Sequence, residues 1–183
     1  MTAPADVVSF WREAGPAKWF AKDDGFDAAI RDGFLDAHFA AARSDLADWE
    51  QTAEGALALL ILLDQFPRNL FRGSGHAFAT DGLARMIARK ALEQGFDHAV
   101  DPKLRPFVYL PFEHSEDPAD QALSMDLFTA HRDETGDTES LRWAVEHRDI
   151  IANFGRFPHR NAALGRATTP EEQTYLDGGG FKG

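Results

Sequence analysis

The segment from Gly55 to Phe66 reads GALALLILLDQF and is apolar on every side for most of its length. Alanine and leucine outnumber β-branched residues in it, and the run is long for a strand, so it predicts a helix. A helix without a polar face must be covered on most sides, which places it centrally in the fold. Thr52 is the expected N-cap, and Pro67 is expected to end the helix. The segment contains Asp64 and is shorter than the ~20 residues that cross a bilayer, so no membrane span is expected.

Helical patterns continue on both sides of this segment. Apolar residues at positions 26, 30, 34, 37 and 41 follow one helical stripe. Asp117, Asp137 or Thr138, and Thr169 are the expected N-caps of three later helices. Asp81 and Arg85 lie four residues apart, which predicts an exposed ion pair. Besides the central helix, the expected helices cover residues 4–15, 24–41, 76–95, 118–136, 138–154 and a short segment after 169. The prolines at positions 102, 106, 111 and 118 restrict residues 102–118 to short helical pieces.

The pattern of the whole chain favours an all-α fold. No segment shows a convincing strand pattern, and the helices are joined by short turns, which is typical of antiparallel helical pairs. We expect six to eight helices. The 183 residues are enough for one domain with a substantial core, so a single all-α domain over residues 1–183 is predicted.

Composition excludes several classes of partner. With 30 acidic and 19 basic side chains the formal charge is −11, which disfavours binding to nucleic acids and to anionic membranes. The chain has no cysteine, so disulfides and thiolate metal sites are excluded. The first residues lack a basic stretch followed by an apolar run, and a cytoplasmic location is expected.

Two stretches share an unusual polar core that could either bind an anion or hold helix ends. They are LDQFPRNLFRG (63–73) and FGRFPHRNAALGR (154–166). Five of the nineteen basic residues lie in them: Arg68, Arg72, Arg156, Arg160 and Arg166. Arginines with bidentate geometry suit a carboxylate or phosphate ligand. The alternative is that they satisfy carbonyls at helix ends or pair with acidic partners such as Asp64, Glu113 or Glu116.

A third polar element, EHSED, follows Phe112. His114 or His159 could act as an acid or base, with Glu116 as the orienting partner. No G-x-S-x-G elbow marks Ser115 as a nucleophile. His114 and Glu116 alone do not complete a metal site, and His147 or His159 would join only if the fold brought them close, so no metal is expected. His147 lies on a partly apolar helix stripe and is interpreted as half-buried, whereas His38, His76, His98 and His131 are expected at the surface.

These motifs resemble the bacterial family of the domain of unknown function 924. The resemblance rests on ALALLILLDQFPRNLFRG, RPFVYLPFEHSEDPADQ and HRDIIANFGRFPHRNAALGRATTPEE, with support from VVSFWREAGPAKWF and YLDGGGFKG. It implies an all-α fold similar to tetratricopeptide-like arrays and no known reaction. Glu113 departs from the family's pattern, so the resemblance implies no role for it, and Pro118 also departs from it. The signature positions that it implies are Asp64, Gln65, Pro67, Arg68, Asn69, Tyr109, Pro111, His114, Ser115, Glu116, Gln121, His147, Gly155, Arg156, Phe157, Pro158, His159, Arg160, Asn161, Gly165 and Arg166.

Three functions remain open from the sequence. The first is binding of a small anionic molecule or a peptide carboxylate in a cleft lined by the motifs. The second is a hydrolase or transferase acting on an anionic substrate, with His114, Glu116 and His159 as catalytic candidates. In the third the motifs are purely structural, and a protein-binding surface lies elsewhere. No cofactor is expected. The predicted ligand-binding residues are Asp64, Arg68, Asn69, His114, Glu116, His147, Arg156, His159, Arg160 and Asn161.

Overall fold

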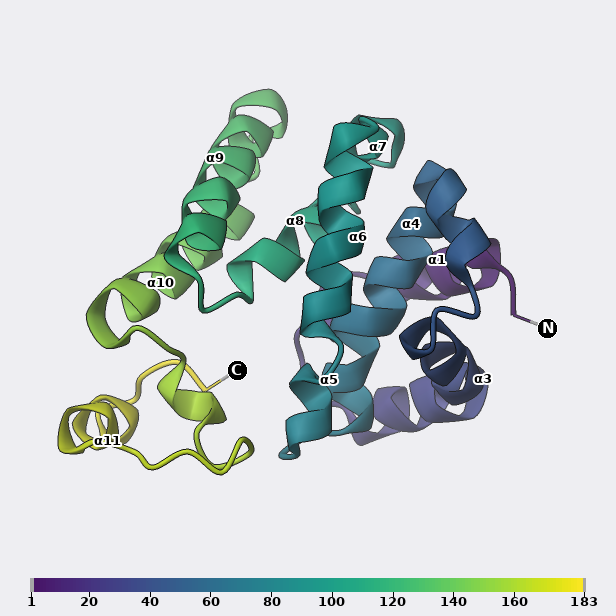
Figure 1. The fold of residues 1–183 in the computed structure, drawn as a ribbon. Coiled ribbons are helices and arrows are strands. Elements are labelled where there is room, and N and C mark those ends of the chain that lie inside the picture. Colours follow the sequence, from purple (N-terminus) through teal and green to yellow (C-terminus); the bar gives the residue numbers. More distant parts are fainter. Residues whose placement is uncertain (1, 183) are drawn as a thin grey trace. The chain divides into compact units, whose positions relative to one another are not determined.

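The structure is a computed structural model that describes residues 2–182, and every regular element in that range is a helix (Figure 1). The all-α prediction is therefore confirmed, and eight of the described α-helices contain eight or more residues, as expected. These residues form two compact units, 2–72 with 76–111 and 73–75 with 112–182. The single domain over 1–183 stays a prediction. Within residues 2–182, no helix combines the length and the apolar character needed to span a membrane.

The first unit is built around the apolar segment. Its elements are α1 (Pro4–Ala14), α2 (Pro16–Trp19), α3 (Asp24–Ala42), a 3-10 turn (Ala47–Gln51), α4 (Ala53–Leu60), a π-helical turn (Ile61–Gln65), α5 (Phe66–Leu70), α6 (Asp81–Glu93) and α7 (Phe96–Ala99). A further 3-10 turn, Gly75–Phe78, precedes α6, and α8 (Pro106–Glu113) contains the boundary between the units. Thr52 caps α4 as predicted, since its hydroxyl accepts a hydrogen bond from the Gly55 N–H at 3.1 Å. Every residue from Gly55 to Gln65 is buried, which confirms the central position of this segment.

Pro67 does not end the central helix, contrary to the expectation. The chain passes through the π turn and continues as α5, with Pro67 in its first turn. The Phe66 N–H bonds to the Ile61 carbonyl five residues earlier, the spacing of a π turn. A proline inside a helix has no N–H to donate, and its ring collides with a carbonyl group of the preceding turn. The wider π turn accommodates the missing hydrogen bond and the ring.

Carbonyl groups in the π turn accept hydrogen bonds from side chains of the first unit. His38 Nδ1 donates to the Leu62 carbonyl oxygen at 2.8 Å, and the Thr80 hydroxyl donates to that of Leu63 at 2.5 Å. Arg68 donates to the Asp64 carbonyl. His38 was expected at the surface but is buried, and this burial lowers its pKa although the bond to Leu62 opposes the shift. The neutral imidazole is thus the form that serves as the donor.

Aromatic side chains fill the space between α1, α3 and the central segment. The Phe66 ring is fully buried, with its centroid 5.2 Å from Phe34, 5.6 Å from Trp11 and 6.1 Å from Phe10. Trp11 also meets Phe107 edge-on at 5.4 Å. The three parts of the first unit are therefore held together by one continuous aromatic cluster.

The second unit contains α9 (Pro118–Thr135), α10 (Thr138–Phe154), a 3-10 turn (Pro158–Arg160) and α11 (Pro170–Asp177). The side chains of Asp117, Asp137 and Thr169 cap the three α-helices, as predicted. Only a short connection through Gly136 separates α9 from α10, and the two helices lie side by side in Figure 1 as an antiparallel pair. Ile150 and Ile151 near the end of α10 form a small core with Phe157, which follows the helix, and Phe154, Tyr175 and Phe181 pack against it.

Candidate functional site

The first arginine motif is an ion-pair network inside the first unit. The Arg68 guanidinium donates to the two carboxylate oxygens of Asp81 at 3.0 and 3.1 Å and lies 3.4 Å from a carboxylate oxygen of Asp64. Burial opposes the charge of Arg68, but the two carboxylates outweigh it and raise its pKa above the ordinary value. Asp81 is buried in this network. The prediction that Asp81 and Arg85 form an exposed pair is therefore wrong about the exposure of Asp81.

Asp27 on α3 binds the rest of the first motif. Its carboxylate accepts hydrogen bonds from Asn69 at 2.7 Å and from Arg72 at 2.6 and 2.9 Å. Burial alone would raise the pKa of Asp27, but the bonds from Arg72 and Asn69 prevail and lower it. The motif therefore fastens the end of the central helix to α3.

The second arginine motif forms a similar network inside the second unit. The buried Glu172 carboxylate accepts two bonds from Arg156, at 2.5 and 2.8 Å, and one from Asn161 at 3.0 Å. It also accepts the Thr169 N–H at 2.8 Å, which completes the capping box of α11. The bonds from Arg156, together with that from Thr169, lower the Glu172 pKa to about 2.

This network makes folding sensitive to acid. The Glu172 pKa is lowered from 4.5 to about 2, so its stabilising contribution is complete above pH 4.5 and is lost as the pH falls towards 2. We expect Glu172→Gln to be less stable at neutral pH and to lose less stability over this range than the wild type. Urea denaturation at each pH measures the difference. Glu171→Gln, at the exposed neighbouring position, is the control, and equal acid slopes for the wild type and Glu172→Gln would contradict the prediction.

Glu116 connects the EHSED segment to the second motif. Its carboxylate accepts bonds from Arg166 at 2.8 and 3.1 Å and from the Phe157 N–H at 2.8 Å. Burial would raise the Glu116 pKa, but these bonds and the nearby charge of Arg160 lower it. No histidine of residues 2–182 is among the hydrogen-bond partners of Glu116, so the predicted orienting role has no geometric support.

Arg160 also joins these two elements. Its Nη1 donates to the His114 carbonyl oxygen at 3.0 Å, and its guanidinium carbon lies 4.4 Å from the centroid of the Phe157 ring. The Arg160 side chain is therefore held against an aromatic face. The second motif and the EHSED segment thus meet in the second unit.

A cluster of Glu113, His114 and His147 lies at this meeting point. His147 Nδ1 lies 2.9 Å from the Trp143 carbonyl oxygen and 3.1 Å from Glu113 Oε1. A carbonyl oxygen can only accept, so Nδ1 carries the proton in the first contact. Glu113 and His147 are buried and His114 is partly buried, and one ligand atom from each lies within 4.8 Å of the others. The prediction that His147 is half-buried underestimates its burial.

Two phenylalanines connect this cluster to His159. The His147 ring lies 5.4 Å from Phe157, 4.6 Å from Phe181 and 6.0 Å from the His114 ring, as measured between centroids. His159 lies 5.6 Å from Phe157 and 5.1 Å from Phe181. We call His114, His147 and His159 the imidazole cluster.

The predicted site residues divide between the two units. Asp64, Arg68 and Asn69 belong to the first unit. The second unit holds the other seven: His114, Glu116, His147, Arg156, His159, Arg160 and Asn161. Sequence reasoning named Glu113 only as a possible acidic partner of the arginines. It missed Phe181, which has no local motif, and Glu172, for which the Thr169-x-x-Glu172 capping box was the available signal.

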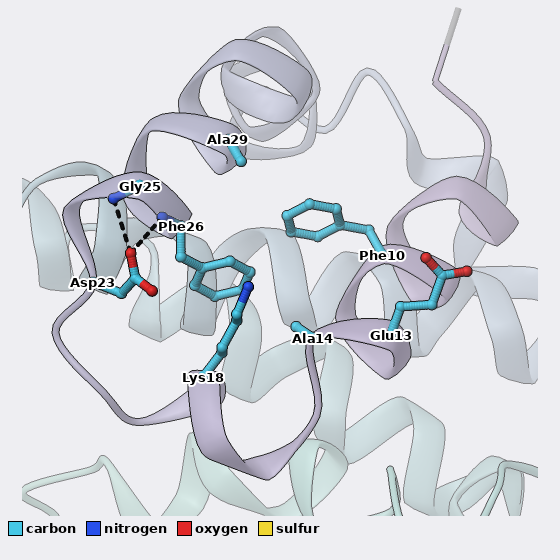
Figure 2. Close-up of a pocket in the computed structure, with 8 residues that line it drawn as sticks. All are labelled: Phe10, Glu13, Ala14, Lys18, Asp23, Gly25, Phe26 and Ala29. Atoms are coloured by element: carbon cyan, nitrogen blue, oxygen red, sulfur yellow. Dashed lines mark hydrogen bonds between the residues drawn. The ribbon is translucent and has the colours of Figure 1, made fainter.

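An open cleft of about 370 Å³ lies in the first unit, between α1, α2 and α3 (Figure 2). Phe10 and Phe26 form apolar walls, and the Lys18 amine lies 5.7 Å from the centroid of the Phe26 ring. Asp23 accepts the Gly25 and Phe26 N–H groups as the N-cap of α3, which accounts for its position on the rim. None of the predicted ligand-binding residues lines this cleft.

Comparison with known proteins assigns the chain to a family. No curated protein matches it. A solved structure, the protein of unknown function ATU0120 from Agrobacterium tumefaciens, is 54% identical, with 96% of this chain and 97% of that chain covered and a TM-score of 0.90. The family described as "Bacterial protein of unknown function (DUF924)" matches residues 7–180. The resemblance seen in the motifs is thereby confirmed, and this chain belongs to the DUF924 family.

Proposed function

We propose that this protein binds a small anionic ligand, a carboxylate in the simplest case, at the imidazole cluster. The observation that carries the proposal is the convergence of three histidines from separate segments. His147 and His159 both contact the rings of Phe157 and Phe181, and the His114 ring lies 6.0 Å from that of His147. Imidazole N–H groups donate hydrogen bonds to carboxylates, and the phenylalanine rings supply apolar contact for the body of a ligand. Arg160, on the face of Phe157, adds positive charge beside them.

The same proposal assigns the other arginines a structural role. Arg68, Arg72, Arg156 and Arg166 each bind a carboxylate of the protein itself. A ligand would have to displace a glutamate or aspartate to reach them, and this is most costly for Arg68 and Arg156, whose carboxylate partners are buried. The arginine clamp first suggested by the sequence is thus less well supported than the imidazoles.

A thermal-shift screen tests the proposal. Metal-free protein is mixed with acetate, succinate and citrate, and with succinamide and putrescine as neutral and cationic counterparts. A ligand at 100 times its Kd stabilises the folded state by about 2.7 kcal/mol. We expect a carboxylate to stabilise the wild type, and the double variant His147→Gln/His159→Gln to lose this effect.

Two control variants make the result specific. His131→Gln changes a buried histidine of α9 outside the cluster and should leave the shift unchanged. Arg156→Lys keeps the charge but loses bidentate geometry, so it should lower the melting temperature without weakening the ligand effect. The proposal fails if no carboxylate acts, if putrescine acts instead, or if only Arg156→Lys abolishes the shift.

A further inference from the structure

We propose that Glu113, His114 and His147 form a binding site for a divalent transition-metal ion. This inference goes beyond the proposed anionic ligand and stands whether or not such a ligand binds. One ligand atom from each residue lies within 4.8 Å of the other two. Two imidazoles and one carboxylate are a ligand set that suits zinc, and equally iron(II) or cobalt(II).

The separations in the cluster are close to those that an ion requires. Bonds of 2.0–2.2 Å in a tetrahedral site hold the ligand atoms about 3.4 Å apart. His147 Nδ1 and Glu113 Oε1 are 3.1 Å apart, so this pair is already at such a distance. The remaining separations lie within 4.8 Å, and side-chain rotation of the partly buried His114 can shorten them.

The charge and burial of the cluster suit a cation. Glu113 and His147 are 2% and 5% exposed, and a buried carboxylate is stabilised by a positive charge beside it. A metal ion bound at His147 Nδ1 would take the place of the proton that this atom donates to the Trp143 carbonyl oxygen, and that hydrogen bond would be given up. Three protein ligands also leave a coordination position open, as in zinc sites that bind water or a substrate.

The site connects directly to the proposed ligand. A ligand carboxylate that approached the imidazole cluster would meet the charge of Glu113, and like charges at short range repel. A divalent ion held by Glu113 makes the local charge positive, and its open coordination position can accept an anionic oxygen. We therefore expect any carboxylate found in the screen to bind more tightly to the metal-loaded protein than to the metal-free protein.

Calorimetric titration with zinc chloride alone tests the metal site. The full chain is treated with a chelator, desalted, and titrated in the absence of any carboxylate. We expect one zinc ion per chain, and an affinity lowered by more than about 10-fold in Glu113→Gln and in His147→Gln, since loss of even an outer-sphere partner of a metal ligand costs about 10- to 100-fold. Cobalt(II) should give visible d–d absorption in the wild type that is lost in both variants.

Controls separate a lost ligand from a lost fold. His131→Gln, a buried histidine of the same unit, should bind zinc like the wild type. Circular dichroism shows whether each variant is folded, and His114→Gln, at the more exposed position, replaces any variant that is not. The inference is overturned if the folded wild type binds no zinc, or if all three ligand variants keep its stoichiometry and affinity. Because no carboxylate is present, that failure would leave the proposed function standing, and a failed carboxylate screen would leave the metal site standing.

Discussion

Replacing Arg68 by alanine should lower the free energy of unfolding by roughly 3–5 kcal/mol, since it removes one partner of a buried ion-pair network. Asp64 and Asp81 have side chains only 1% and 8% exposed, and both lie against the Arg68 guanidinium. Without that charge, both buried carboxylates lose the cation that they share. Urea denaturation at neutral pH measures the loss.

Arg72→Ala is the matched control from the same motif. Arg72 binds Asp27 at short range, but its side chain is 37% exposed. An exposed ion pair contributes ~0–1 kcal/mol, so the expected loss is several times smaller than that of Arg68→Ala. Equal losses for the two variants would mean that burial does not set the strength of this network.

Phe66→Ala should be as damaging, with an expected loss of roughly 3–5 kcal/mol of unfolding free energy. The Phe66 side chain is 0% exposed and touches the rings of Trp11 and Phe34, so its removal leaves a cavity between α1, α3 and the central segment. Phe20→Ala removes the same number of atoms from a side chain that is 69% exposed and should cost much less. Thermal and urea denaturation of both variants compare the two positions, and a small loss for Phe66→Ala would argue against this core.

Much of the fold follows from local patterns in the sequence. The apolar run was long enough to predict the central helix, and Thr52, Asp117, Asp137 and Thr169 all cap helices as expected. Such caps are recognisable because each satisfies N–H groups within three residues of itself.

The π turn before Pro67 could not be predicted in this way. Proline normally ends a helix, and the continuation to Leu70 depends on donors that are distant in sequence. His38 lies 24 residues before its acceptor Leu62, and Thr80 lies 17 residues after Leu63. Only the tertiary fold brings these groups together, and the same contact explains why His38 is buried.

The candidate site was predictable only in part. The sequence indicated that the second motif and the EHSED segment carry related polar groups, and Arg160 and Glu116 do connect them. It could not decide which carboxylate meets which cation. Glu116 binds Arg166, whereas Glu113 lies beside His147.

The arginine motifs have parallel structural roles in the two units. In each, arginine and asparagine side chains bind a carboxylate from another segment, Asp27 in the first unit and Glu172 in the second. Such networks fix helix ends in one arrangement and satisfy polar groups that the prolines displace. Arg68, Arg72, Arg156 and Arg166 each bind a carboxylate of the protein itself, and the proposed binding is therefore assigned to the imidazole cluster.

The most direct test of this division is an NMR titration of side-chain nitrogens with citrate and succinate. The account predicts that the ring signals of His114, His147 and His159 shift together, while the Nε–H signals of Arg156 and Arg166 stay in place. Saturating shifts of Arg156 or Arg166 with unchanged histidine rings would contradict it and would return the binding site to the arginine motif.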